Sequence, residues 1–355
     1  MGTQAATTPA KPSETRSSLS RRVLLTAAAS AAGGAILNGL STPAIAQTGN
    51  AKVVAKFGHD SGIVSGAQSY AEFLAGRVAQ LTDNELEIQI YPASQLGSGS
   101  ELIQSVKQGT LEFTIPTAVL AATIVAPELG VLGLPYLIRD EDQSVRIEYS
   151  QAAEALRSRS LQAGVRILAF APNEARILLY RMRDGKPVLK VDDVADMKVR
   201  VLESPIDVAE WTVCGALPTP VAFGEVYSAM QQGVVTGVDN GFNAGASIRL
   251  DEVINAVSLT NHRYEINLVL TNEHWFQSLP KRYQAALLTG ASEARIYQQA
   301  SVMWDAIRLP KVWFEKHKVR TFLPDRTGFI SKMTSIYPQF EGKYGKDLIQ
   351  LVEKA

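Results

Sequence analysis

The side chains that most often perform catalysis or bind metals are scattered along this sequence. Its four histidines do not form the His-x₃-His pair typical of a zinc site; they are His59, His262, His274 and His317. The segment 62–66 has a serine among glycines, but its spacing differs from that of the Gly-x-Ser-x-Gly nucleophile elbow. The glycines at 97 and 99 lack the third glycine of a dinucleotide-binding loop and indicate a turn. The usual motifs of enzymes are therefore missing.

Two of the predicted strands contain arginines in their interior. Residues 174–183 form an arginine-rich strand that contains Arg176. In the strand at 197–202, Val199 and Val201 share one face, so Arg200 must point away from the packed side of the sheet.

Strands and helices alternate along the chain in the manner of an α/β fold. Strands are predicted at 52–57, 86–91, 111–115, 165–170, 174–183 and 197–202. Helices are predicted at 65–81, 101–108, 141–163, 204–215, from 224, over 281–315 as one or two long helices interrupted by Pro310, and in the tail from 329. No internal repeat or long linker separates these parts, so we expect two lobes connected by several segments of the chain that pass between them.

The beginning of the chain has the features of an export signal. Arg21 and Arg22 precede an apolar stretch at 23–37, which is too short to span a bilayer. A small-x-small site at 44–46 predicts cleavage directly after it, and the absence of a following cysteine argues against a lipid anchor. The arginine pair resembles the twin-arginine signal, with a Sec signal that happens to contain two arginines as the alternative. We expect residues 1–46 to be removed and the mature chain to be soluble in the periplasm.

The composition limits the possible partners. The chain has 355 residues, 46% of them hydrophobic, which is ample for a sizeable core. Its 35 basic and 35 acidic residues balance, so nothing points to nucleic acid or an anionic membrane as partner. The only cysteine, Cys214, excludes an internal disulfide and a multi-thiolate zinc site, and we expect it in the core. We expect no cofactor, no metal and a monomer.

Six motifs follow one another at consistent spacing over nearly all of residues 51–350. In order, they are Lys56-Phe57-Gly58, Tyr91-Pro92-Ala93-Ser94-Gln95-Leu96-Gly97, Leu134-Pro135-Tyr136, Met197-Lys198-Val199-Arg200-Val201, Pro218-Thr219-Pro220-Val221-Ala222-Phe223-Gly224-Glu225-Val226-Tyr227 and Gln231-Gln232-Gly233-Val234-Val235-Thr236-Gly237. Together they resemble the solute-binding proteins of TRAP transporters, the DctP-type family.

The resemblance implies an architecture and a set of partners. It implies a two-lobe α/β periplasmic binding protein fold, with a ligand cleft between the lobes and long helices crossing between them. We expect lobe 1 to contain residues 47–173 and about 264–300, and lobe 2 to contain 174–263 and about 301–355. The cleft would close on a small-molecule carboxylate and deliver it to TRAP permease subunits, which are driven by a sodium gradient.

The resemblance also assigns roles to individual residues. Arg200 matches the family's carboxylate-binding arginine, and Arg176 matches a second one, for which a structural pair with Glu174 is the alternative. Asn240 aligns with an asparagine whose amide can donate to a carboxylate and accept from a hydroxyl. Phe223 resembles the aromatic residue that packs on the apolar face of the ligand.

Further cleft positions bear on which acid is bound. Asp60 falls at a polar cleft position, and because an aspartate repels a carboxylate it would have to face ligand hydroxyls. Thr117 stands where sialic-acid receptors of the family have a glutamate, which argues against sialic acid. A smaller sugar acid such as an aldonate or uronate, a hydroxy acid or a keto acid fits better. His59 and Tyr264 are additional cleft candidates.

Two other functions fit the same residues. A periplasmic enzyme acting on an organic acid would also use an arginine pair to hold its substrate, although no base, nucleophile or metal set is visible beside Arg200. A sensor subunit that docks to a receptor kinase would need the same site. For the receptor, we expect the carboxylate to bridge Arg200 and Arg176 on lobe 2 while lobe 1 closes over its distal end.

Overall fold

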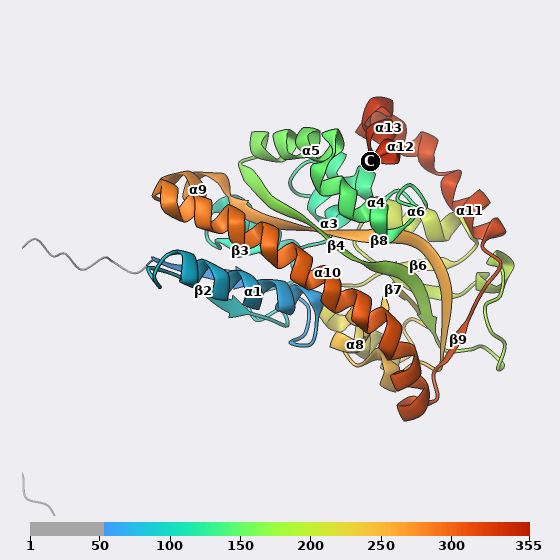
Figure 1. The fold of residues 1–355 in the computed structure, drawn as a ribbon. Helices are drawn as coiled ribbons and strands as arrows, with labels where there is room; N and C mark the ends of the chain where they lie inside the picture. The colour runs from blue at the N-terminus through green and yellow to red at the C-terminus, as the bar shows by residue number, and fades with distance from the viewer. Residues whose placement is uncertain (1–52) are drawn as a thin grey trace, which may run out of the picture. The chain divides into compact units, whose positions relative to one another are not determined.

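The computed structural model describes residues 53–355, so the predicted signal segment 1–46 lies outside the described residues. In the described part, no helix is both long enough and apolar enough to cross a membrane. A mixed sheet of nine strands carries the fold of this part, in the order β2-β1-β3-β8-β4-β7-β5-β6, with β9 beside β8. Helices flank this sheet (Figure 1). The predicted α/β class is confirmed.

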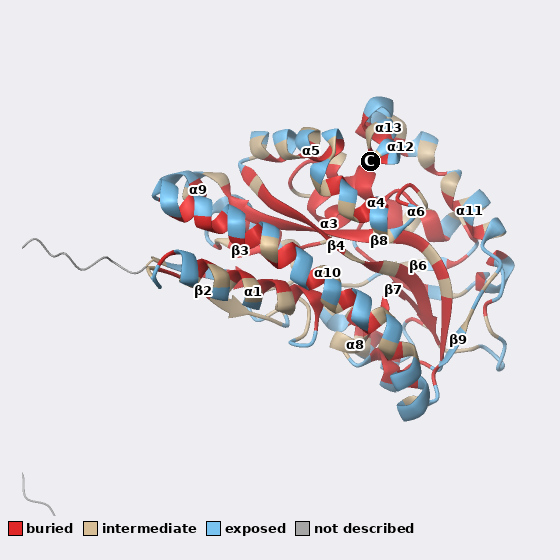
Figure 2. Ribbon diagram, viewed as in Figure 1, coloured by how far each residue is buried: buried red, intermediate tan, exposed pale blue. Residues whose placement is uncertain are grey.

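Two long antiparallel strands, β4 and β8, form the middle of the sheet and connect its two ends (Figure 1). Most of their residues are buried (Figure 2). At one end β3 pairs with β8, and at the other β7 pairs with β4. The strands are β1 (Val53–Gly58), β2 (Leu86–Tyr91), β3 (Phe113–Thr114), β4 (Val165–Tyr180), β5 (Lys198–Val201), β6 (Leu217–Pro220), β7 (Gly237–Asn240), β8 (Ala256–Asn272) and β9 (Arg320–Phe322).

Strand β4 replaces the two separate strands predicted at 165–170 and 174–183. Its pairing with β8 shifts register between Pro172 and Ala175, where two residues of β4 lie opposite one residue of β8. Such a bulge bends a strand and re-aims its side chains without ending it. The middle of the sheet is therefore continuous but bent at the place where Glu174 leaves the regular ladder.

Every predicted helix has a counterpart, but the helix predicted over 141–163 is divided, and the short helices at 118–122, 242–247 and 273–278 were not predicted. The helices are α1 (Gly66–Leu81), α2 (Gly99–Gln108), α3 (Ala118–Ala122), α4 (Glu141–Arg146), α5 (Gln151–Gln162), α6 (Pro205–Val213), α7 (Val226–Gln231), α8 (Phe242–Ser247), α9 (Glu273–Ser278), α10 (Lys281–His317), α11 (Thr327–Thr334), α12 (Tyr337–Tyr344) and α13 (Lys346–Lys354), with short 3₁₀ turns η1 (Pro127–Gly133), η2 (Ile147–Tyr149), η3 (Val191–Val194), η4 (Phe223–Glu225) and η5 (Leu250–Glu252). The single helix predicted over 141–163 is divided because Ser150 is extended and its hydroxyl caps α5. Ser204 takes the N-cap position of α6 as predicted, but its side chain makes no capping bond.

Helix α10 is one continuous helix that contains Pro310 in its interior. A proline removes one helical hydrogen bond, and packing of the surrounding turns can offset that cost. Leu287 lies in the core with α1, whereas Trp313 packs with Phe242 of α8. Helix α10 therefore joins the cores at the two ends of the sheet (Figure 1).

Four buried clusters fill the described part of the chain, two at each end of the sheet. The clusters around Leu129 and Phe57 flank the end that contains β1 to β3. Those around Val238 and Trp211 flank the end that contains β5 to β7, and Cys214 lies in the last of them as expected. The predicted lobe boundaries stay a prediction. Packing of α12 and α13 with the Leu129 cluster favours placing these two helices in lobe 1 instead of lobe 2.

Candidate ligand-binding site

A cavity of about 60 Å³ lies between the two ends of the sheet. Its walls come from the segments that follow β1, β3 and β5, from the end of β7, and from the bulged middle of β4 beside β8. Carboxyl ends of parallel strands are a frequent place for ligands in open α/β sheets. The lining residues are Asp60, Ser61, Ile115, Pro116, Thr117, Leu120, Asn173, Glu174, Arg176, Leu202, Phe223, Asn240, Ala244, Glu265 and Asn267.

The structure brings five of the eight predicted residues together around this cavity. Asp60 and Thr117 come from the β1 to β3 end, whereas Arg176, Phe223 and Asn240 come from β4 and the β5 to β7 end. These side chains are separated by up to 180 positions in the sequence. Their convergence gives the cavity a polar wall of mixed charge.

His59 and Tyr264 do not line the cavity, contrary to the prediction. His59 is buried with Nε2 2.9 Å from Oε1 of Gln68, toward α1, and its ring lies edge-on to Phe57. Tyr264 packs against the Leu129 cluster. Because Glu265 lines the cavity, the alternation of a strand turns Tyr264 to the other face of the sheet.

Arg200 lies beside the cavity with its guanidinium nearly free of protein partners. Its side chain is 1% exposed, and Nε donates to the carbonyl oxygen of Val221 at 2.9 Å. Nη1 and Nη2 have no hydrogen-bond partner within residues 53–355. The guanidinium carbon is 5.8 Å from the ring centre of Phe223, which does line the cavity. As the alternation predicted, Val199 packs with Trp211 on the opposite side of β5.

Burial and the neighbouring Arg176 lower the pKa of Arg200 to about 10. The side chain therefore stays charged at neutral pH, although its charge is removed from water. A buried charge without a partner is costly, and the cost falls when an anion supplies the missing acceptors. The two free Nη atoms match the two oxygens of a carboxylate.

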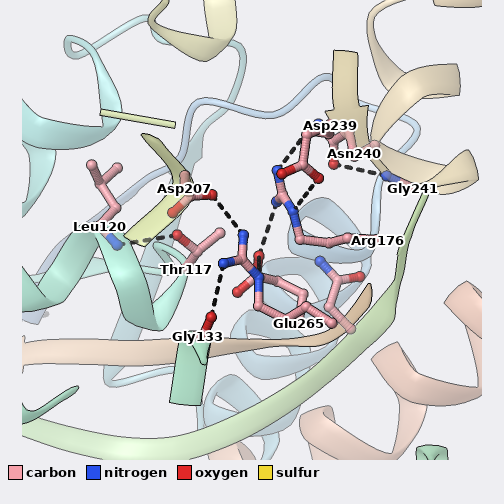
Figure 3. A network of polar contacts seen from close by, with 12 residues as sticks. Thr117, Leu120, Gly133, Arg176, Asp207, Asp239, Asn240, Gly241 and Glu265 are labelled. Atoms are coloured by element: carbon pink, nitrogen blue, oxygen red, sulfur yellow. Dashed lines mark hydrogen bonds and ion pairs between the residues drawn. The ribbon is translucent and has the colours of Figure 1, made fainter. Parts of the chain in front are cut away.

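Arg176 is held by acidic groups, but these are not Glu174, the structural partner considered from the sequence. Nε donates to Oδ1 of Asp239 at 2.8 Å, Nη2 to the Asp239 carbonyl oxygen at 2.5 Å, and Nη1 to Oε2 of Glu265 at 2.9 Å (Figure 3). Burial works against the charge, yet Asp239 and Glu265 outweigh it and raise the pKa of Arg176. A guanidinium has five N–H groups, so one on each Nη atom remains for a ligand.

Asp239 is the centre of a fully buried polar network beneath the cavity. Besides Arg176, its carboxylate accepts from Nε1 of Trp211 at 2.9 Å and lies 3.1 Å from Nε2 of His262. Arg263 continues the network through Nη2, which donates to Asp207 at 2.6 Å. Ion pairs on both sides of Asp239 fix the direction in which Arg176 points into the cavity. None of these partners was predicted from the sequence.

Glu210, Asp239 and His262 bring their ligand atoms within 4.8 Å of one another, as a metal site would. Positive charge of the protein already occupies this place, because Nη1 of Arg263 lies 3.6 Å from Glu210 and Arg176 binds Asp239. Burial raises the pKa of Glu210 well above its ordinary value, which favours its neutral form. We therefore assign the three residues to the buried network.

Asn240 and Thr117 keep donor capacity for a ligand while stabilising the local backbone. Oδ1 of Asn240 accepts from the Gly241 N–H at 3.0 Å, which leaves the amide NH₂ group for other partners. The Thr117 hydroxyl caps α3 by accepting from the Leu120 N–H at 3.3 Å, so its proton is free to be donated (Figure 3).

Glu174 lines the cavity from the bulge of β4 and caps α8. Its two carboxylate oxygens accept from the backbone N–H groups of Asn243 at 2.7 Å and Ala244 at 2.8 Å. An added Cβ at Gly241 would lie 2.0 Å from the Glu174 carboxyl carbon, so a glycine is needed there. Asn243 also accepts from the N–H of Gly66, at the start of α1. The cavity wall is thus connected to a contact between the two ends of the sheet.

Stability should depend on pH through Glu174. Burial raises the pKa of Glu174 from its ordinary 4.5 to about 7, against the two backbone hydrogen bonds that lower it. The folded protein then holds this proton more tightly than the unfolded chain does, so the contribution to stability is complete below about pH 4.5 and is lost as the pH rises through 7. The difference is roughly 3 kcal/mol.

The measurement is urea unfolding of the parent and the Glu174→Gln variant at several pH values. The variant cannot titrate at this position, so it should gain stability relative to the parent between pH 5 and pH 8. Loss of a backbone hydrogen bond in the variant would add a constant offset only. Parallel pH curves for the two proteins would contradict the raised pKa of Glu174.

Several residues that line the cavity were not predicted from the sequence as site residues. Glu265 and Asn267 alternate with Tyr264 and Ile266 in a strand that is otherwise largely apolar, and this was a usable signal. Asn173 and Glu174 lie at a bulge, which interrupts the alternation that would have indicated their direction.

Residues 57–343 match the family model of bacterial extracellular solute-binding proteins, family 7, named DctP. The chain belongs to this family. The resemblance stated from the six motifs is thereby confirmed. Members of the DctP family are solute-binding proteins, not a class of enzymes.

Three similar proteins have names that state what each of them binds. The chain is 28% identical to the C4-dicarboxylate-binding periplasmic protein DctP of Rhodobacter capsulatus, over 73% of this chain and 75% of the relative. It is 27% identical to the 2,3-diketo-L-gulonate-binding periplasmic protein YiaO of Escherichia coli, over 70% and 75%. A TRAP periplasmic solute-binding protein from Sulfurospirillum deleyianum, solved with bound succinate, covers 85% of this chain and 99% of its own, with a TM-score of 0.78 and 27% identity.

Proposed function

We propose that this chain is the periplasmic receptor of a TRAP transporter, which captures a small organic acid and delivers it to membrane permease subunits. The acid is a sugar acid, a hydroxy acid or a keto acid. One observation carries the proposal: the Arg200 guanidinium is buried beside the cavity and its Nη1 and Nη2 atoms have no acceptor within the described residues. A carboxylate supplies two acceptors in the matching geometry.

Arg176 supports the same role from the cavity wall. Its charge is matched by Asp239 and Glu265, so it adds direction and hydrogen bonds more than net attraction. The ligand carboxylate would bridge Arg200 and the remaining N–H groups of Arg176. The three relatives named above bind compounds that share a carboxylate, which agrees with an anchor built from arginine.

The remaining lining residues suit capture by closure of two lobes. Asp60 and Thr117 approach the cavity from one end of the sheet, whereas Phe223 and Asn240 approach from the other. A ligand that contacts both sets favours the closed state, because those contacts form together only there. Phe223 would cover the apolar face of the ligand, and Asn240 would bind its carboxylate or an adjacent hydroxyl.

The proposal includes export and assembly. We propose that residues 1–46 act as a twin-arginine signal that is removed in the periplasm, and that the mature receptor is a monomer.

A thermal-shift screen tests the receptor function directly. A ligand that binds only the folded state raises the melting temperature by mass action. The panel contains sugar acids, hydroxy acids, keto acids and dicarboxylates, with the neutral sugar or alcohol of the same skeleton beside each acid as the control. We expect at least one acid to raise Tm by several degrees while its neutral counterpart does not. Hits confined to neutral or cationic compounds would refute the proposal.

A further inference from the structure

The cavity offers binding groups for one carboxylate and opposes a second one. We propose that the site selects monocarboxylates that place a hydroxyl beside Asp60, and that it rejects dicarboxylates of the same length. This inference rests on the proposed function, since it takes Arg200 as the anchor of the first carboxylate. Selection against dicarboxylates would distinguish this chain from the relatives that bind C4-dicarboxylates and succinate.

The positive charge near the cavity is sufficient for one anionic group only. Arg176 is the only basic residue among those that line the described cavity, and it is already paired with Asp239 and Glu265. Arg200, next to Phe223, is the adjacent guanidinium whose Nη atoms lack acceptors in the described chain. One carboxylate that bridges Arg200 and the remaining N–H groups of Arg176 uses these donors. A second carboxylate would find no unmatched cation along the lining.

Apart from Arg176, the charged side chains that line the cavity are acidic. Three carboxyl groups line the cavity, those of Asp60, Glu174 and Glu265. Glu265 is held by Arg176, and both oxygens of Glu174 are occupied by backbone N–H groups.

Asp60 has fewer hydrogen-bond partners: Ser61 Oγ donates to it at 3.4 Å. Burial raises the pKa of the Asp60 carboxyl, and nearby His59 and Arg200 act in the opposite direction. With so few partners, the Asp60 carboxylate keeps acceptor capacity, and a ligand group beside it is attracted when it carries a proton to donate.

A hydroxyl meets this requirement and a carboxylate does not. A hydroxyl donates one hydrogen bond and accepts others, whereas an ionised carboxylate only accepts. Thr117, Asn173 and Asn267 also line the cavity and can both donate and accept. Like charges a few ångströms apart repel strongly when they are shielded from water. The end of the cavity near Asp60 is thus suited to a hydroxyl.

Matched pairs of acids test the selection. L-Threonate and L-tartrate differ only in the oxidation state of one terminal carbon, and so do D-galactonate and galactarate. We would measure the affinities of the full mature protein for all four compounds by titration calorimetry at pH 7.5. The monoacid of at least one pair should bind, with its diacid at least 100-fold weaker. A diacid that binds within threefold of its monoacid, or more tightly, would overturn the selection.

Two variants assign the cause and separate this inference from the proposed function. Asp60→Asn keeps the shape of the side chain but removes its charge, so it should raise affinity for the diacid at least tenfold. Asp184→Asn, at an exposed turn outside the cavity, is the matched control and should change the affinity for neither acid. Unchanged diacid affinity in Asp60→Asn would remove Asp60 from the mechanism and refute the inference.

Arg200→Ala distinguishes the two possible failures. If a monoacid or a diacid binds and Arg200→Ala abolishes that binding, the role of Arg200 in the proposed function is supported. The proposed selection is then judged only by the affinities of the two members of each pair. If binding of the acids survives Arg200→Ala, or if none of the acids in the panel binds, the proposed function itself fails and the selection fails with it.

Discussion

Replacing Arg200 with methionine should weaken binding of the acid ligand by at least 100-fold and at the same time raise the melting temperature of the ligand-free protein. Loss of one partner of a buried, hydrogen-bonded charge pair costs about 2–5 kcal/mol of binding free energy. Methionine fills a similar volume without a charge. The free protein gains because burial has lowered the pKa of Arg200 from 12.5 to about 10, which corresponds to roughly 3 kcal/mol against its charged form.

The opposite signs of these effects make the experiment informative. A variant that merely misfolds would lose both affinity and stability. Arg200→Lys keeps the charge but loses the two parallel donors, so it should bind at least tenfold more weakly than the parent. Arg183→Met, at an exposed position outside the cavity, is the control. Calorimetry and thermal unfolding provide the two readouts, and parent-like affinity of Arg200→Met would refute the role of Arg200.

Local periodicity predicted the direction of Arg200 correctly. Val199 and Val201 alternate with it in a four-residue strand, and the structure places both valines in a core and Arg200 on the other face. The alternation could not show that this face is also buried. On that face, Nε of Arg200 donates to the Val221 carbonyl oxygen and the ring of Phe223 lies 5.8 Å away, and both belong to a later segment of the chain.

The resemblance to the DctP family identified cavity residues that lie at or just after the ends of strands. Asp60, Thr117 and Asn240 each follow or end a strand, and the position of a strand end is a local property. His59 and Tyr264 lie outside the cavity lining for a related reason. Each is next to a cavity residue in the sequence, and in extended chain adjacent side chains point in different directions.

The ion pairs between residues far apart in the chain could not be predicted from the sequence. Asp239 and Arg176 are 63 positions apart, and their contact depends on the register of β4 against β7. Asn240 was predicted as a site residue because it aligns with an asparagine of the family. The side chain of the preceding Asp239 points the other way, into the buried network. No pattern in one sequence specifies which acidic group pairs with a given arginine.

Replacing Asp239 with asparagine should lower the free energy of unfolding by about 3–5 kcal/mol, the usual cost of breaking a buried ion pair. Arg176 would keep Glu265 as its only anionic partner, and the new amide NH₂ group would face the Nε1 donor of Trp211. Urea unfolding measures the change, with Asp184→Asn as the exposed control.

Ligand affinity should fall in Asp239→Asn as well, even though Asp239 does not line the cavity. The carboxylate and the backbone carbonyl of Asp239 together hold two nitrogens of Arg176, so removal of the charge frees the guanidinium to turn toward Glu265. Calorimetry on the folded variant should therefore show weaker binding with Arg200 intact. If the variant is as stable as the parent and binds equally well, Glu265 alone suffices to hold Arg176, and Asp239 has no part in orienting the site.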